Sequence, residues 1–418
     1  MLYPHTNFAN KDVQSQLAVD YPLYIKLVWG YTFSCMTSLL SGLQSALSSL
    51  SGKGKDESVL GVDIGSSSIK LVQLRASKGS AILETYGEIA LGPYAGVAVG
   101  KVTKLSADKI ATALSDLMKE ANVTATHAGV AIPFTSSLIM IIDLPATDKD
   151  QLKRMIPIEA RKYIPLPISE VTLDWFPIPK EDKEQDAFDR LEKETPIQKT
   201  GQEVLLAAIH NDILRAYQTV MDTTGLTVSF FEIEVFSTIR SSLGHSPAPV
   251  AVIDIGASST KIYVIERGVV RLSHFLNIGA QQMTEILARS LDWTFEKAER
   301  MKREAGFNES PMYSREENDR MHEALSSPLS RIFTEANRVL IMFGKRYNKN
   351  VSKAILVGGG ASLPNLAPFA HEAMHLDIEI ADPFVKVEAP AFLEEVLRSI
   401  GPGFSTAVGV ALRKLAEN

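Results

Sequence analysis

The sequence contains the same short motif twice. Residues 59–74 and 250–265 each place Asp-Ile-Gly, a run of small residues and a lysine between two apolar arms. The arms are rich in Val, Ile and Leu and contain no proline, which is typical of buried strands. The glycine allows the chain to turn tightly. Each motif therefore predicts a β-hairpin, and the repetition predicts two similar domains that face one cleft.

The turns of the two hairpins have the chemistry of a phosphate site. Exposed N–H groups and hydroxyls at such a turn form a cradle for an anion. Asp63 and Asp254 end the first arms, and each could hold a hydrated Mg²⁺ that contacts the phosphates. The predicted phosphate-binding residues are Gly65, Ser66, Ser67, Ser68 and Lys70 in the first hairpin, and Gly256, Ala257, Ser258, Ser259 and Thr260 in the second.

A third glycine site lies near the end of the chain. A strand-like run at 354–357 leads into Gly358, Gly359 and Gly360, followed by Ser362. Consecutive glycines after a buried strand leave room for a flat base or a ribose. We therefore expect this turn to lie against the nucleoside part of a ligand.

Two Asp-Ile-Gly hairpins followed by a late Gly-Gly-Gly resemble the actin, Hsp70 and hexokinase superfamily. The resemblance implies an α/β, actin-like (RNase H-like) fold of two lobes that closes on Mg-ATP. It also implies that residues 298–303 match the Hsp70 helix that reaches the adenosine, with Glu299, Lys302 and Arg303 on one face. A solvated helix face is the alternative interpretation of these three residues.

Two connecting segments extend this resemblance. Residues 232–240 match the first connecting segment, in which some relatives use an acid to position the attacking water, so Glu234 is the catalytic candidate. A helix-initial acid favoured by the helix dipole is the alternative. Residues 401–412 match the closing helix, whose small residues Gly403, Ala407 and Gly409 would let two helices cross closely at the hinge.

A narrower resemblance rests on residues 158–167, which read Ile-Glu-Ala-Arg-Lys-Tyr-Ile-Pro-Leu-Pro, and on the Asp-aromatic strand at 173–175. This pattern resembles the PilM family, actin-like proteins of type IV pilus assembly that are related to FtsA. It implies an inserted subdomain of the SHS2 type in the first lobe. The implied division is an extension at 1–55, a first lobe at 56–245 with the insertion at about 137–228, and a second lobe at 246–418 with a helical subdomain at about 282–348.

The resemblance implies a function as well as a fold. The expected role is an ATP-binding scaffold on the cytoplasmic face of the inner membrane, serving pilus assembly and twitching motility, with at most slow ATP hydrolysis. The implied partner is the N-terminal cytoplasmic tail of a PilN-like membrane protein, alongside other platform proteins. Tyr163 and Ile164 would shape the wall of the groove for that tail, or else anchor a local core. Self-association, an FtsA-like membrane-associated filament protein and a sugar- or acetate-type kinase remain alternatives.

The composition of the chain argues against some other classes of protein. A net charge of −6 without a long basic stripe argues against nucleic-acid binding. A single cysteine, Cys35, excludes an intramolecular disulfide framework and fits a reducing compartment.

The first 55 residues add one candidate element. Apolar residues between Phe33 and Leu50 recur at helical spacing opposite an uncharged polar face, which predicts an amphipathic helix. Such a helix could contact a membrane peripherally, dock to a partner or pack on the protein itself. Met36, at the start of this stretch, is a candidate true start of the chain. Residues 52–57 then predict a charged linker, and the charge run at 180–194 predicts a solvated loop.

Overall fold

The computed structural model describes residues 58–77, 79–145, 147–179, 201–244 and 246–417. The amphipathic helix expected at 33–50, the linker at 52–57 and the charge run at 180–194 lie outside these residues, so they remain predictions. Among the described helices, none combines the length and the apolar character that crossing a membrane requires.

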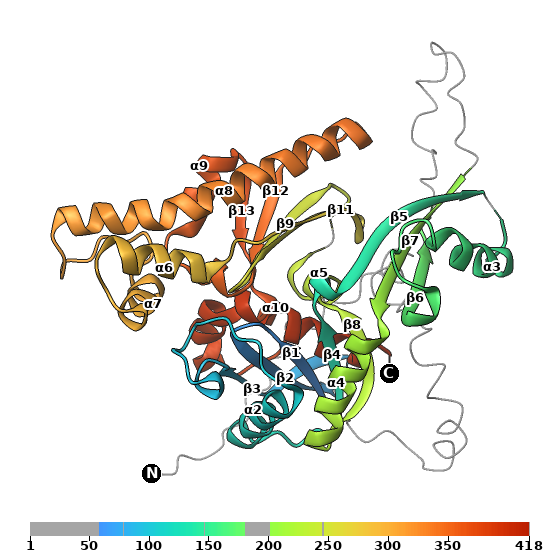
Figure 1. Ribbon diagram of the computed structural model, residues 1–418, viewed down its shortest axis with the longest axis horizontal. Helices are drawn as coiled ribbons and strands as arrows, with labels where there is room; N and C mark the ends of the chain where they lie inside the picture. Colours follow the sequence, from blue (N-terminus) through green and yellow to red (C-terminus); the bar gives the residue numbers. More distant parts are fainter. Residues whose placement is uncertain (1–57, 78, 146, 180–200, 245, 418) are drawn as a thin grey trace, which may run out of the picture.

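Two five-stranded sheets of the same topology form the centre of the protein (Figure 1). In each sheet three antiparallel strands are followed by two parallel ones, in the orders β3-β2-β1-β4-β8 and β11-β10-β9-β12-β13. The first sheet consists of β1 (Ser58–Ile64), β2 (Ser68–Ser77), β3 (Ser80–Ala90), β4 (His127–Ile132) and β8 (Thr227–Ile233). The second consists of β9 (Val250–Ile255), β10 (Thr260–Glu266), β11 (Val269–Leu276), β12 (Lys353–Val357) and β13 (Asp377–Ile380). Each repeated motif therefore forms the first hairpin of its own sheet, as predicted.

A third, antiparallel sheet is inserted between β4 and β8. Its order is β5-β7-β6, and it extends to one side of the first lobe (Figure 1). The elements of this insertion are β5 (Ser137–Pro145), α3 (Lys149–Ala160), β6 (Val171–Pro177) and β7 (Gly201–His210), and α4 (Asn211–Thr224) then returns the chain to the first sheet. Helix α4 ends as predicted at Gly225, whose φ of 76° is the left-handed conformation that glycine adopts readily.

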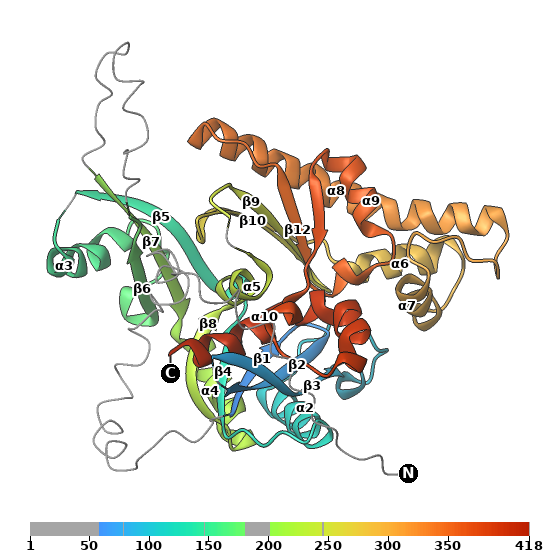
Figure 2. The same ribbon diagram turned by 180° about the vertical axis from the view of Figure 1, so that it is seen from behind.

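Helices cover both faces of the first sheet. Leu114 of α2 (Ala107–Glu120) and Met221 of α4 pack on one face with Leu60 and Leu71. The other face, with Val72 and Leu74, carries α10 (Glu394–Glu417), which crosses this sheet in the view from behind (Figure 2). Buried strands covered on both faces need apolar side chains at nearly every position, which explains the continuous Val, Ile and Leu runs of the motif.

The second sheet is also covered on both faces. The long helix α8 (Arg315–Tyr347) and helix α9 (Leu366–Met374) pack on one face around Ile253 and Phe333. Helix α5 (Glu234–Ser242) and the inserted sheet pack on the other face around Tyr263. Helices α6 (Ala280–Ser290) and α7 (Phe295–Glu304) follow β11 in the chain.

Two helices are longer than the segments identified from the sequence. The sequence predicts an amphipathic helix from Pro328 to Tyr347, but α8 begins at Arg315 with a capping box formed by Ser314 and Glu317. The proline lies buried inside the helix, so the packing of its neighbours outweighs the missing N–H. Similarly, α10 begins at Glu394 and continues through Pro402.

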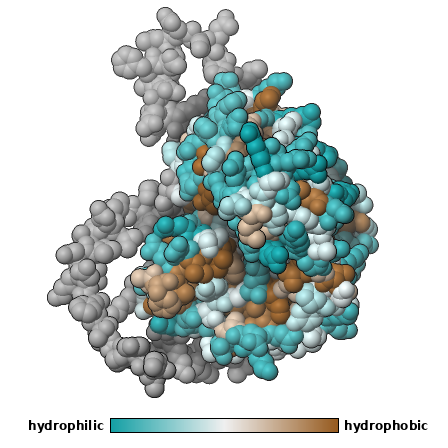
Figure 3. Space-filling view, turned by 90° about the vertical axis from the view of Figure 1, so that its left-hand side faces the viewer, coloured by the Kyte–Doolittle hydropathy of each residue, from teal (hydrophilic) through white to brown (hydrophobic). Residues whose placement is uncertain are grey.

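The surface is largely hydrophilic on the face drawn in Figure 3, and hydrophobic residues gather in its lower half. Among the described residues, the exposed large hydrophobic side chains include Val385, Phe392 and Val396 near the start of α10, and Ile158, Tyr163 and Leu166 in the insertion. The large apolar side chains of the central strands β1, β2, β9, β10 and β12 are buried in the cores on either side of the two sheets.

Candidate functional site

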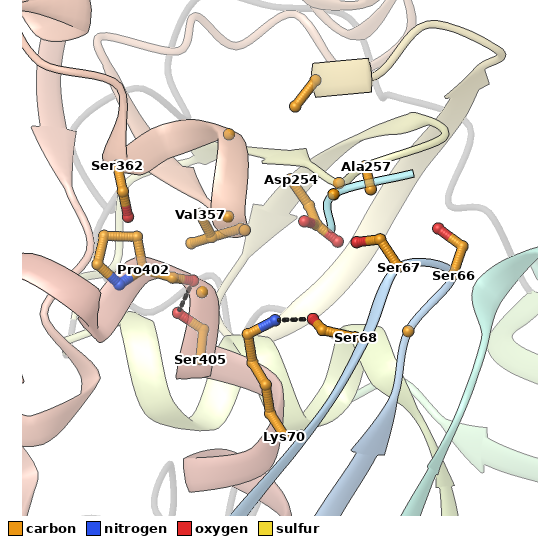
Figure 4. Close-up of a pocket in the computed structure, with 18 of the residues that line it drawn as sticks. Ser66, Ser67, Ser68, Lys70, Asp254, Ala257, Val357, Ser362, Pro402 and Ser405 are labelled. Carbon is orange, nitrogen blue, oxygen red and sulfur yellow. Dashed lines mark hydrogen bonds between the residues drawn. The ribbon is translucent and has the colours of Figure 1, made fainter. Parts of the chain in front are cut away.

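A cavity of about 510 Å³ lies between the two lobes. Pockets for small ligands in proteins typically measure about 300–1,000 Å³. Its walls come from both hairpin turns, from the turn after β12 and from the first half of α10 (Figure 4). Residues of α7 also line the cavity. The sequence elements predicted to bind a nucleotide therefore converge on one space although they are far apart in the chain.

The two hairpin turns have the same backbone geometry. Gly65 N–H donates to the Ser68 carbonyl at 3.0 Å, and Gly256 N–H donates to the Ser259 carbonyl at 2.9 Å. The two turns approach each other closely, and the hydroxyls of Ser66 and Ser258 are 3.1 Å apart. Nearly all predicted phosphate-binding residues of both hairpins line the cavity, namely Gly65, Ser66, Ser67, Ser68, Lys70, Gly256, Ala257, Ser258 and Ser259.

Thr260 is the exception, and the prediction for it was wrong. Its hydroxyl donates to the Ile278 carbonyl at 2.8 Å, its side chain is fully buried, and it does not line the cavity. Thr260 is the first residue of β10, where side chains alternate between faces, so it points away from its neighbour Lys261.

Lys261 is a site residue for which the sequence analysis predicted no role. Its ammonium group lies 3.0 Å from the carboxylate of Asp254 and 3.1 Å from that of Glu234. Burial alone would lower the pKa of Lys261, but these two carboxylates outweigh burial and raise it above its ordinary value. The repeat could have identified Lys261 as a site residue, because Lys70 occupies the equivalent position in the first hairpin and was predicted to bind phosphate. Lys70 instead contacts Ser68 Oγ at 2.8 Å (Figure 4) and the carboxylate of Glu88 at 3.0 Å.

Asp63 and Asp254 both line the cavity, one from each hairpin. Burial raises the pKa of Asp63 to about 6, and the carboxylates of Glu234 and Asp254 add to the rise while Lys70 and Lys261 oppose it. No group of three or more His, Cys, Asp or Glu able to hold a metal exists among the described residues. Two carboxylates that line the same cavity fit a hydrated Mg²⁺ bound through waters.

Glu234, the predicted catalytic candidate, is the first residue of α5 and lines the cavity. Its carboxylate accepts the Phe134 N–H at 2.7 Å in addition to its contact with Lys261. Its place in the first turn of α5 also agrees with the alternative interpretation as a helix-initial acid.

The three glycines of the turn after β12 have two different structural roles. Gly358 has φ of 84°, and a Cβ there would lie 2.4 Å from Asp254 Oδ1. A Cβ on Gly360 would lie 2.4 Å from the Ile255 side chain, whereas one on Gly359 would meet nothing within 4 Å. Gly358 and Gly360 therefore let the turn pack against β9, and Gly359 leaves open space in the cavity. Ser362 also lines it.

The three predicted residues of α7 meet at the cavity wall. Glu299 accepts hydrogen bonds of 2.6 Å from Lys302, Arg303 and Thr284. Glu299 and Lys302 are buried, so the alternative of a purely solvated face is wrong for these two residues. Burial lowers the pKa of Lys302, while the Glu299 carboxylate opposes this change.

A loop of the first lobe, residues 91–106, reaches across to α6 and α7. Val102 N–H donates to Gln281 Oε1 at 2.5 Å, and a Cβ on Gly100 would lie 2.8 Å from the Glu299 carboxyl carbon. Thr103 N–H donates to the Ser66 carbonyl at 2.9 Å. Gly100 and Gln281 are cavity residues that the sequence analysis missed, since neither belongs to a recognisable motif.

The candidate partner-binding residues lie in the insertion. Ile164 is buried with α3 and the inserted sheet, which confirms the core-anchor alternative for this residue. Tyr163 is 43% exposed, near the exposed side chains of Ile158 and Leu166. The cavity is therefore separate from Tyr163, which does not line it.

A small hollow lies between the inserted sheet and the first lobe. It is lined by residues of β6, β7, β8, α5 and α10, including Thr172, Asp174, Phe236 and Arg413. Asp174 is 8% exposed, and its Oδ2 has no hydrogen-bond partner among the described atoms. Burial raises the pKa of Asp174 to about 7, against the opposing effects of the Trp175 N–H and Arg413.

Comparison with known proteins assigns the family. A family model described as type IV pilus assembly protein PilM matches residues 61–415. This chain belongs to the PilM family. A solved PilM–PilN type IV pilus biogenesis complex superposes with a TM-score of 0.68 and 24% identity, covering 85% of this chain and 98% of that one. The fold is therefore actin-like, and family membership assigns the protein to type IV pilus assembly.

Two more distant structures are similar to this chain. The ethanolamine utilization protein EutJ from Carboxydothermus hydrogenoformans has a TM-score of 0.49 and 16% identity, covering 88% of this chain and 93% of that one. MreB5 of Spiroplasma citri bound to ADP has a TM-score of 0.46 and 10% identity, covering 87% of this chain and 99% of that one.

Proposed function

We propose that this PilM-family protein is an ATP-binding scaffold whose nucleotide sets the arrangement of its two lobes. The observation that carries this proposal is the convergence of both Asp-Ile-Gly hairpins and the triple-glycine turn on one cavity. A ligand held by turns from two lobes binds a closed arrangement better than an open one. Such a ligand shifts the equilibrium by the difference between its two affinities.

Each part of ATP would contact a different group of residues that line the cavity. The serine hydroxyls and N–H groups of the two turns would hold the phosphates, with Lys70 supplying positive charge. The open space at Gly359 and the α7 residues Glu299, Lys302 and Arg303 would hold the adenosine. Asp63 and Asp254 would hold Mg²⁺ through waters, and the ion would neutralise phosphate charge.

The partner side of the proposal concerns a PilN-like protein of the inner membrane. The solved PilM–PilN complex supports a partner of this kind for a member of the same family. An extended tail can pair with a strand edge and place alternate side chains in pockets. The exposed surface around Tyr163 is the first candidate for this contact, and the hollow at Thr172 and Asp174 is the second. Through such a partner the protein would lie at the cytoplasmic face of the inner membrane.

Calorimetry with Asp254→Ala tests the nucleotide site. Loss of the carboxylate should weaken Mg-ATP binding at least about tenfold, equivalent to about 1.4 kcal/mol. Asp319→Ala, which removes an exposed carboxylate from α8, is the matched control and should bind as the native chain does. Unchanged affinity in a folded Asp254→Ala protein would remove Asp254 from the site, and no binding of ATP by the native chain would reject the proposal.

A further inference from the structure

The lysines of the two hairpins make different contacts although they occupy the same place in the repeat. Lys261 lies directly opposite Asp254 in the pairing of β9 and β10, so the two side chains share one face of the hairpin. Lys261 then reaches both Asp254 and Glu234, whereas Lys70 contacts Ser68 and pairs with Glu88 in the first lobe. Only the second lysine therefore binds Glu234, the catalytic candidate.

Glu234 is held from two sides. The Phe134 N–H fixes it at 2.7 Å, and Lys261 lies 3.1 Å away with a side chain that is only 11% exposed. An ion pair buried to this extent is costly to separate, because each charge would be left without its partner. With the Phe134 N–H and the Lys261 ammonium group both bound to it, the Glu234 carboxylate is held in one position.

ATP hydrolysis would depend on such a carboxylate. A water oxygen bonds to the γ-phosphorus, the bond from that phosphorus to the bridging oxygen breaks, and ADP leaves with the bridging oxygen. The water loses a proton to a nearby base or to the phosphate itself. A general base in position typically contributes about 10²–10⁴-fold to the rate of a reaction of this type.

We propose that Lys261 is a positioning residue that suppresses ATP hydrolysis by binding Glu234 and holding it away from the attacking water. This inference rests on the proposed binding of ATP in the cavity. Lys261 also binds Asp254 of the second lobe while Glu234 begins the helix that leaves the first sheet, so one ammonium group joins both sides of the cavity. ATP that is bound and not consumed can act as a lasting conformational ligand.

Single-turnover hydrolysis of Mg-ATP by the full chain tests this role. Lys261→Met removes the charge with little change in length and should raise the rate by about tenfold or more, because Glu234 is released. Lys261→Arg keeps the charge and should stay close to the native rate. Lys261→Met combined with Glu234→Gln should lose the gain, which a merely structural role of Lys261 would not produce.

Two controls make each outcome decisive. Thermal unfolding and ATP calorimetry establish that each variant is folded and loaded, and Lys261→Gln replaces Lys261→Met if the methionine variant does not fold. A folded, ATP-bound Lys261→Met or Lys261→Gln protein that hydrolyses no faster than the native chain overturns the inference but leaves the ATP-binding proposal intact. A tenfold loss of the native rate in Glu234→Gln alone also overturns it, since Glu234 would then already act as a base. Failure of the native chain to bind ATP instead removes the proposed function itself.

Discussion

Gly409 of α10 lies directly against the backbone of Ser237 in α5. A Cβ on Gly409 would be 1.9 Å from the Ser237 carbonyl oxygen, so only glycine allows the two helices to cross at this distance. Hydrogen bonds flank the crossing, with Arg240 Nη1 donating to the Gly409 carbonyl at 2.9 Å and the Thr238 and Thr406 hydroxyls 3.1 Å apart. The chain passes between its lobes through these two helices, so their contact fixes the geometry of the hinge.

Gly409→Ala should therefore destabilise the protein. Alanine normally favours a helix over glycine by up to about 1 kcal/mol, but here the added methyl must force the helices apart. Overpacking of this kind typically costs about 1–3 kcal/mol. Chemical denaturation followed by circular dichroism measures the effect. Gly244→Ala is the control, because a Cβ there meets nothing within 4 Å, and equal stability of the two variants would contradict this account of the crossing.

Asp174 predicts a dependence of stability on pH. The folded state raises the pKa of this acid to about 7, above its ordinary 3.8, mainly through burial. Between these values the folded state binds more protons than the unfolded state, so stability falls as pH rises from about 4 through 7. Asp174→Asn mimics the neutral acid and should increase the free energy of unfolding at pH 8 by at least about 1 kcal/mol, with little effect near pH 4.

Unfolding midpoints of both proteins across this pH range measure the difference. Asp143→Asn, which removes an exposed acid from β5 at the opposite edge of the same sheet, should leave the pH dependence unchanged. Parallel curves for native and Asp174→Asn proteins would mean that Asp174 is not responsible.

The repeated motif made both lobes predictable, since a buried hairpin needs apolar arms and a small turn wherever it occurs. The glycine turn and the Glu-Lys-Arg helix, both identified in the sequence, lie at the cavity wall. Contacts between distant segments were not predictable, because they depend on packing. The pairing of Lys261 with Glu234 and the loop contact between Val102 and Gln281 are of this kind. The buried proline of α8 misled the helix prediction because local propensity opposed a helix that tertiary packing maintains.

A series of variants distinguishes the proposed partner-binding site from the proposed nucleotide-binding site. Tyr163→Ala should weaken binding of a synthetic PilN-tail peptide about tenfold or more, because the exposed ring supplies much of the contact area that an aromatic anchor provides. It should leave Mg-ATP binding nearly intact, since Tyr163 does not line the cavity. Asp63→Ala should do the reverse, apart from coupling between the sites of about 1–3 kcal/mol, at most about a hundredfold.

Fluorescence anisotropy of the labelled peptide and calorimetry with ATP measure the two affinities on the same preparations. Thr172→Arg provides the comparison, because it fills the hollow beside Asp174 and leaves the surface around Tyr163 unaltered. If peptide affinity falls in Thr172→Arg and not in Tyr163→Ala, the tail binds in the hollow between the inserted sheet and the first lobe. If neither variant changes it, the tail binds at neither place, and the assignment of the insertion as the partner-binding region is wrong.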